Sequence, residues 1–333
     1  MANFFSLVSI WIGDLFSHFR IFWVVFSIIF LIIYIILFNR KKVDFKVLIS
    51  IFASLFINLF SSYSFWTNSQ TYEYLFFGSP TVVEYSKKVK KEIENDTTVN
   101  SLLLINVLSS NTNYEKVREL IKNTDADFVV IIELNQKWED ELKKIKTDYP
   151  YKFTEVREDN FGMGIYSKEK YQDTSKIRLS THIFEVKNLE KQVESILETT
   201  KNLPIEIQIT TKNNYTFFIS HPMPPISINA YRNRNNKLDQ ISEILSKLNS
   251  KVIFVGDLNC SPFSSDYKKF LKQSSLKDSQ ENFGFQPTWN SSFPFLMQTQ
   301  LDHVWHSEGI EILHRQTLPI EGSDHKAVLV VFR

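Results

Sequence analysis

The stretch KVIFVGDLNC, residues 251–260, decides how the rest of the chain is interpreted. An apolar run leads directly into Gly256, Asp257 and Asn259, which is the pattern of a buried strand that ends in a small residue, a carboxylate and a carboxamide. Polar side chains just past the carboxyl end of a buried strand are held at the rim of an α/β sheet, where a ligand reaches them. Gly, Asp and Asn are also common turn residues, so this stretch alone leaves a plain turn open.

The same arrangement recurs along the chain from Ser101 onward, where apolar strand patterns alternate with amphipathic helix patterns. The polar residues at or beside a predicted strand end are Asn106, Glu133, His221, Asp257, Asn259, Asp302, Asp324 and His325. Each alone has an ordinary structural explanation, such as a surface residue after a strand. Gathered in space, they would supply oxygen ligands for a hard cation and histidines that handle protons or contact phosphoryl oxygens.

The donor types favour one kind of metal. Carboxylates and carboxamides predominate, and the histidines lack the close helical spacing of a zinc site. The set therefore predicts Mg²⁺, with Mn²⁺ as the alternative. Cys260 is the only cysteine, which excludes an intrachain disulfide and a cysteine zinc cluster.

The N-terminal part has a different composition. Residues 21–38 and 47–66 are two uncharged, mostly apolar runs, each close to the roughly 20 residues that cross a bilayer. We expect two transmembrane helices in a hairpin, although a buried soluble helix stays open for the second run. The loop between them is rich in Lys and Arg, which predicts that it faces the cytoplasm and that the remainder of the chain lies outside it. Residues 4–13 are interpreted as an interfacial or re-entrant piece.

These patterns divide the chain into a membrane region over residues 1–66, a linker helix within 67–100 and a folded domain over 101–333. Residues 1–66 hold five of the 38 Lys and Arg and two of the 37 Asp and Glu, which leaves 33 basic and 35 acidic residues in the remainder. A protein that holds nucleic acid through its phosphates usually carries a basic surplus. Charge therefore argues against nucleic acid as the partner, and no protein partner is evident.

Six motifs carry a resemblance to a known family. INVLSSN, VVIIELN, ISHPMPP, VGDLNCSPFS, LDHVW and GSDHKAV occur in the order found in the endonuclease/exonuclease/phosphatase superfamily. From about Leu102 to its end, the chain resembles a bacterial membrane-anchored member. The resemblance implies a four-layered α/β sandwich, in which two mixed sheets pack face to face with helices outside, and it implies metal-dependent hydrolysis of a phosphoester.

The resemblance also implies roles for the strand-end residues. Glu133 would hold Mg²⁺ with help from Asn106, and Asp324 would lie beside the metal. Leu108 stands where some nuclease members carry a polar residue, which puts a second metal site in doubt. The other roles concern the phosphate and the attacking water. His325, oriented by Asp302, would contact the phosphate or activate the water, and Asp257 is the alternative residue for activating the water. Asn259 and His221 would donate hydrogen bonds to phosphoryl oxygens.

The substrate is inferred less directly, because this superfamily cleaves many phosphoesters. The membrane region and the near-neutral domain favour a lipid-linked phosphate or pyrophosphate, in line with membrane members that act on prenyl pyrophosphates. An extracytoplasmic nuclease and a non-catalytic receptor are the alternatives. Arg232 and Arg234 follow His221 and would read a second phosphate or a headgroup, unless they only begin a helix and face water. Trp289, Phe293, Phe295 and Leu296 would line an acyl or prenyl groove, or pack in the core.

Overall fold

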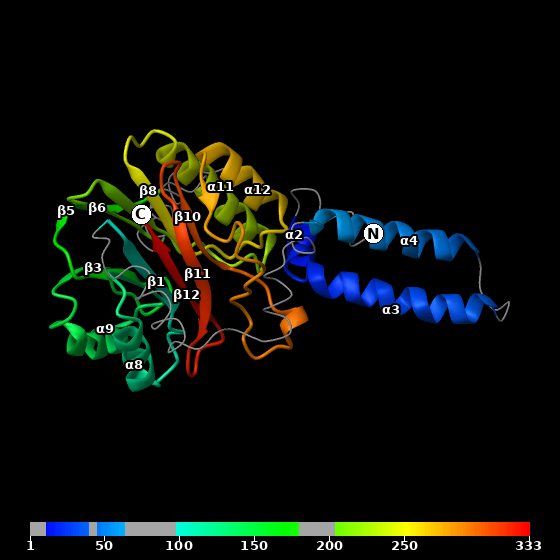
Figure 1. Cartoon of the computed structure of the whole chain (residues 1–333), viewed down its shortest axis with the longest axis horizontal. Coiled ribbons are helices and arrows are strands. Elements are labelled where there is room, and N and C mark those ends of the chain that lie inside the picture. The colour runs from blue at the N-terminus through cyan, green and yellow to red at the C-terminus, as the bar shows by residue number, and fades with distance from the viewer. Residues whose placement is uncertain (1–10, 40–44, 64–97, 180–203) are drawn as a thin grey trace, which may run out of the picture.

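The structure, a computed structural model, describes residues 11–39, 45–63, 98–179 and 204–333. Two sheets lie face to face with helices on their outer faces, and a pair of apolar helices projects from one end of this body (Figure 1). The linker helix expected within residues 67–100 falls outside the described residues up to residue 97.

The first sheet has the strand order β11-β12-β1-β2-β4-β3. β1 and β2 are parallel, and every other neighbouring pair in this sheet is antiparallel. The bounds of its strands are β1 Asn100–Asn106, β2 Phe128–Ile132, β3 Tyr151–Glu155, β4 Met163–Ser167, β11 Ile312–Pro319 and β12 Lys326–Phe332.

The second sheet has the order β5-β6-β7-β8-β10-β9 and repeats this design, with one parallel pair, β7 and β8, among antiparallel neighbours. Its strands are β5 Tyr171–Ile177, β6 Glu206–Thr211, β7 Tyr215–Ile219, β8 Lys251–Asp257, β9 Lys277–Asp278 and β10 Asp302–His306. In both sheets the parallel pair brings two strand ends to the same edge.

Alternation along the strands separates the layers. Leu102 and Leu104 of β1 face the other sheet and pack with Ile219 and Val255, while Leu103 and Ile105 face outward onto helices. The outer helices are α8 Tyr114–Thr124 and α9 Gln136–Leu142 on the first sheet, and α11 Ile228–Leu245 and α12 Ser265–Ser274 on the second. Two short 3₁₀ turns, η1 Lys143–Ile145 and η2 Phe295–Met297, complete the described elements. This arrangement confirms the four-layered α/β sandwich.

The apolar N-terminal runs form α3 Arg20–Asn39 and α4 Phe45–Ser61, which lie side by side in Figure 1. Residues Arg20–Phe38 have a mean hydropathy of 3.1 and are long and apolar enough to cross a membrane by length and composition. The second helix has 17 residues and ends at Ser61, and residues 64–66 of the expected run lie outside the described residues. Length and composition therefore support one spanning helix and leave the second crossing a prediction.

A short helix, α2 Trp11–His18, precedes α3 and contacts the sandwich. Its Trp11 Nε1 donates a hydrogen bond to the carbonyl oxygen of Pro225 at 2.7 Å. Ile21, at the start of α3, packs with Phe263 and Phe285 of the sandwich. Of the segment 4–13 that we expected at the interface, the described residues 11–13 belong to this docked helix.

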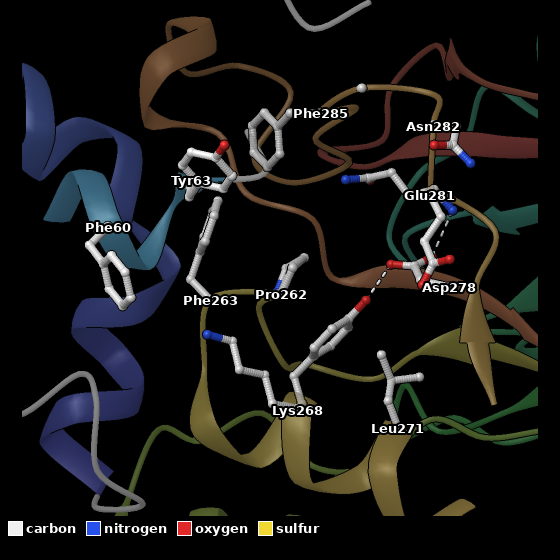
Figure 2. Close-up of a pocket in the computed structure, with 13 residues that line it drawn as sticks. Phe60, Tyr63, Pro262, Phe263, Lys268, Leu271, Asp278, Glu281, Asn282 and Phe285 are labelled. Carbon is white, nitrogen blue, oxygen red and sulfur yellow. Dashed lines mark hydrogen bonds between the residues drawn. The ribbon is translucent and has the colours of Figure 1, made fainter. Parts of the chain in front are cut away.

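The end of α4 also borders the sandwich. Phe60 and Tyr63 line one side of a cavity of about 460 Å³, and Phe263, Lys268 and Phe285 of the sandwich line the other (Figure 2). None of the predicted site residues lines this cavity. We therefore assign it to the junction between the apolar helices and the sandwich.

Candidate active site

The polar residues predicted from strand ends gather at one edge of the two sheets. Asn106 ends β1, and Asp257 ends β8 in the facing sheet. β10 begins at Asp302, which is paired directly with Asp257 across the antiparallel ladder. His325 immediately precedes β12, which runs antiparallel to β1 and so starts where β1 ends. The face-to-face packing of the sheets therefore brings together residues that are far apart in the sequence.

Local backbone geometry explains the glycine in the stretch VGDLN. Gly256 has a φ of 154°, and a Cβ at this position would lie 1.9 Å from the carbonyl oxygen of Ser220 at the end of β7. Only glycine allows this approach. Asn259 and Glu133 both adopt the left-handed region, with φ values of 48° and 64°. Such conformations cost on the order of 1–3 kcal/mol each and concentrate at functional sites.

Asn106 connects the two sheets at the centre of the site and is fully buried. Its Nδ2 donates to Asp257 Oδ2 at 3.0 Å and to Glu133 Oε1 at 3.2 Å, and its Oδ1 accepts from the backbone N–H of Leu108 at 3.0 Å. The amide nitrogen, not the oxygen, therefore faces the carboxylates. In this arrangement Asn106 donates to the two acidic side chains, and its predicted help in holding the metal stays a prediction.

His325 and Asp302 form a buried pair, with 2.7 Å between Nδ1 and Oδ2. The other ring nitrogen of His325, Nε2, lies 3.7 Å from Asp257 Oδ2. Burial disfavours the charged imidazolium, but the carboxylates of Asp302 and Asp257 outweigh it and raise the pKa of His325 to about 10. At neutral pH this histidine is therefore protonated and able to donate from Nε2.

The pKa values of Asp257 and His221 are shifted in opposite directions. Burial and repulsion from Asp302 raise the pKa of the Asp257 carboxyl to about 7, against the lowering influence of His325. Burial, followed by the charge of His325, lowers the pKa of His221 to about 3. His221 is therefore neutral at pH 7, with its Nε2 at 3.7 Å from Asp257 Oδ2. Asp257 is the group in this cluster that changes its protonation state near neutral pH.

The donor set fits a divalent cation. Ligand atoms of Asp257, Asp302 and His325 lie within 4.8 Å of one another, and because His325 is protonated at neutral pH the two carboxylates are the ligands of this group. Among the described residues, nothing hydrogen-bonds Oδ1 of Asp302 or Oδ1 of Asp324, although both atoms are buried. Glu133 adds a carboxylate, which accepts hydrogen bonds from Asn106 and from the backbone of Ser109. Buried carboxylate oxygens without donors are suited to a hard cation.

Several of these residues line a cavity of about 620 Å³. The strand-end residues in its lining, which we call the polar wall, are Glu133, His221, Asp257, Asn259, Asp324 and His325. Its lining also has apolar side chains from α2, the turn after it and the loop after β7, which we call the apolar wall: Leu15, Phe19, Pro224, Pro225 and Ile226. Phe161, another apolar lining residue, lies against His221, with 5.3 Å between the ring centroids. Leu15 belongs to α2, and Phe19 lies in the turn between α2 and α3. The segment that leads into the apolar α3 thus lines the same cavity as the strand-end residues.

The sequence-based interpretation missed this contribution of α2. A signal was present, because Asp14 is a lone carboxylate between two apolar runs, and a buried charge needs a partner. That partner is Arg234, whose Nη1 lies 2.8 Å from Asp14 Oδ2. Arg234 is fully buried and does not line the cavity, so it does not lie where the predicted role in substrate binding requires it. Arg232 is exposed and is not part of the cavity lining either.

The residues predicted to line an acyl or prenyl groove lie in two different places. Trp289 lines the cavity and donates from Nε1 to Asp324 Oδ2 at 2.9 Å. Phe295 and Leu296 instead pack near Ile21 at the start of α3. Trp289 thus orients Asp324, and the other two join the apolar helices to the sandwich.

Comparison with known proteins gives the family. Residues 103–325 match the model of the Endonuclease/Exonuclease/phosphatase family. Among solved structures, TDP2 from D. rerio complexed with single strand DNA product is similar, with a TM-score of 0.55 and 16% identity over 71% of this chain and 99% of that chain. A functionally unknown conserved protein from Enterococcus faecalis V583 has a TM-score of 0.52 and 20% identity over 70% of this chain and 99% of that chain. No curated protein matches by sequence. At such identities the solved structures share the fold alone, whereas the family match covers more than half of the sequence, and the chain belongs to the endonuclease/exonuclease/phosphatase family.

Proposed function

We propose that this protein is a membrane-anchored, Mg²⁺-dependent phosphoesterase that hydrolyses a lipid-linked phosphate or pyrophosphate outside the cytoplasm. One observation carries the proposal. A single cavity is lined both by strand-end carboxylates and histidines and by apolar side chains from the segment that leads into α3. A ligand with a phosphate at one end and a hydrocarbon chain at the other matches both walls.

Glu133 and Asp324 would hold the cation, with an oxygen of Asp257 or Asp302 within reach, and the bound cation would polarise the phosphoryl oxygens. Asp257, whose pKa is about 7, is the group that takes the proton of the attacking water. His325 is protonated at neutral pH because its pKa is about 10, so it donates a hydrogen bond to a phosphoryl oxygen instead of acting as the base. Asn259 and neutral His221 line the same wall and would donate further hydrogen bonds.

The membrane location rests on α3 and on the charges around it. Arg20–Phe38 is apolar, and the basic residues Arg40, Lys41, Lys42 and Lys46 follow it. Short basic loops stay in the cytoplasm, which would place the sandwich outside if α4 returns across the bilayer. A reporter fused after Arg333 should then be active only outside the cytoplasm, and one inserted near Lys42 only inside. A cytoplasmic position for both reporters would contradict the topology.

The substrate class is tested by offering full-length protein in vesicles three substrates with Mg²⁺: a prenyl pyrophosphate, a phospholipid dispersion and single-stranded DNA. We expect phosphate release from the prenyl substrate. DNA should be cut slowly or not at all, because a near-neutral domain gains little from counterion release. Rapid DNA cleavage with untouched lipids would favour a nuclease, a reaction suggested by the fold shared with the DNA complex of TDP2. Binding without any hydrolysis would favour a receptor.

A further inference from the structure

The Asp14–Arg234 ion pair connects α2 to the loop that carries a predicted catalytic residue. We propose that Asp14 and Arg234 are positioning residues: through their buried pair, the N-terminal helix holds Asn259 in its working conformation, so the active site is complete only when α2 is docked. The inference rests on the phosphoesterase activity proposed above, but not on the lipid nature of the substrate.

The geometry of Arg234 supports this role. Its Nη1 donates both to Asp14 Oδ2 at 2.8 Å and to the backbone carbonyl oxygen of Asn259 at 2.7 Å. The side chains of Asp14 and Arg234 are 1% and 0% exposed, so neither charge is screened by water. A second carboxylate, Asp266, lies 3.4 Å from Nη2. One guanidinium thus joins α2, α11 and the loop after β8.

Several contacts hold Asn259 in its conformation. Its φ of 48° lies in the left-handed region, which asparagine tolerates better than most non-glycine residues. Its backbone N–H donates to Asp257 Oδ1 at 3.0 Å, and its Nδ2 donates to the carbonyl oxygen of Pro222 at 3.1 Å. The bond from Arg234 to the carbonyl oxygen fixes the far side of the same residue. Loss of that bond would release Asn259 and, with it, the hydrogen bond to Asp257.

The other polar contacts of α2 go to the same two loops. Trp11 donates to Pro225 in the loop after β7, and Ser261, in the loop after β8, donates to the backbone oxygen of Ser17 at 3.4 Å. Both loops supply lining residues of the cavity, including Asn259 and Ile226. Docking of α2 therefore orders the loops that carry substrate-contacting groups, in addition to covering them.

The chain provides a matched control for the cost of breaking a buried pair. Lys237, one turn along the same helix α11, lies 2.5 Å from Glu206, and these side chains are 9% and 0% exposed. Lys237 reaches toward β6 and Pro204 and does not line the cavity. Its charge is one of those that lower the pKa of His221, so removal of Glu206 leaves His221 neutral at pH 7, as in the parent protein. Removal of the carboxylate from either pair takes a counter-charge from a buried cation, so both variants should lose thermal stability, although Arg234 keeps Asp266 at 3.4 Å. Only the Asp14–Arg234 pair should affect catalysis.

The test compares Asp14→Asn with Glu206→Gln in full-length protein, using a small water-soluble phosphodiester that needs no hydrocarbon site. We expect Asp14→Asn to lower kcat at least about tenfold with little change in KM. Glu206→Gln should lower Tm by a similar amount while kcat per folded molecule stays near the parent value. Equal kcat values in the two variants would overturn the proposal.

A combined variant separates positioning from folding. Asp14→Asn, Arg234→Met and Asp266→Asn together remove the guanidinium and both of its carboxylates, so Tm should recover relative to Asp14→Asn alone, while kcat stays low because the bond to Asn259 is missing. Recovery of kcat together with Tm would show a purely structural role. If the parent protein hydrolyses neither the diester nor a lipid-linked phosphate or pyrophosphate, the proposed activity fails. The positioning role is then tested by the affinity for inorganic phosphate in the presence of Mg²⁺. We expect Asp14→Asn to bind phosphate at least about fivefold more weakly than the parent protein, and Glu206→Gln to bind it with unchanged affinity.

Discussion

The two walls of the cavity differ in origin. The polar wall is built from the ends of strands in both sheets, and the apolar wall is built from α2 and the loop at residues 224–226. The strand ends of the sandwich thus supply groups suited to phosphoester chemistry, whereas α2, the turn after it and a loop of the sandwich supply a surface suited to hydrocarbon. We therefore expect substitutions of polar-wall side chains to affect the reaction itself and substitutions of apolar-wall side chains to affect substrate choice, and each prediction below acts on one wall.

The largest expected effect is that of metal removal, which acts on the polar wall. Chelation should abolish hydrolysis of every substrate by at least about a thousandfold, because a bound cation supplies several kcal/mol of charge stabilisation. Mg²⁺ should restore the rate, and Mn²⁺ should substitute for it. The assay is phosphate release from both a soluble and a lipid-linked substrate before and after chelation. Persistent turnover in excess chelator would exclude the proposed use of Glu133 and Asp324.

Substitutions in the polar wall should have the next largest effect. Glu133→Ala, Asp257→Ala and His325→Ala should each lower kcat at least about a hundredfold on soluble and lipid substrates alike, as expected for loss of a metal ligand or a positioned proton donor or acceptor. Asp239→Asn is the control, since Asp239 is a partly exposed carboxylate that pairs with Lys269 away from the site. Full activity of His325→Ala would show that the catalytic centre lies elsewhere.

The pH profile tests the assignment of the base within the same wall. A carboxyl group accepts a proton only when ionised, so with a pKa of about 7 for Asp257 the value of kcat/KM should rise about tenfold per pH unit below pH 7 and level off above it. A fall is expected near pH 10, where His325 loses its proton. In Asp257→Asn the remaining kcat/KM should no longer rise with pH below pH 7. A rise that survives this substitution would assign it to another group.

The smallest expected effect is that of the apolar wall, and it should depend on the substrate. Phe19→Ser should raise KM for a long-chain phosphate about tenfold, since it removes apolar area worth a few kcal/mol at most. The rate with a soluble phosphoester should be unchanged. Tyr151→Ser, a change of an exposed aromatic residue on the edge strand β3, is the matched control. An equal loss on both substrates would mean that Phe19 supports the fold and does not bind the chain.

The polar wall was largely predictable because its signal is local. An apolar run that ends in a carboxylate, as at Glu133 or Asp257, identifies a strand end without knowledge of the strand's neighbours. The order of the motifs then indicated the sandwich, which the structure confirms. The direction of the Asn106 amide was not predictable, because it depends on the backbone of Leu108 and on carboxylates from two sheets.

The apolar wall was not predictable because it depends on contacts between distant parts of the chain. Asp14 and Arg234 lie 220 positions apart, and nothing in the pattern around either residue identifies the other. Arg234 was assigned to the substrate because it follows His221 closely in sequence. On α11, however, Arg234 faces inward while Arg232 is exposed, which is a property of helix packing and not of spacing.

The most direct test of the two-wall account uses two substrates that share one phosphate group and differ only in chain length. The account predicts that kcat/KM for the long-chain substrate exceeds that for the short one by at least about a hundredfold, since each buried CH₂ contributes roughly 0.8 kcal/mol. In Leu15→Ser combined with Phe19→Ser, the ratio should fall toward one while the short-chain rate is retained. A parent protein that does not distinguish the two substrates, or a double variant that keeps the full ratio, would contradict the account.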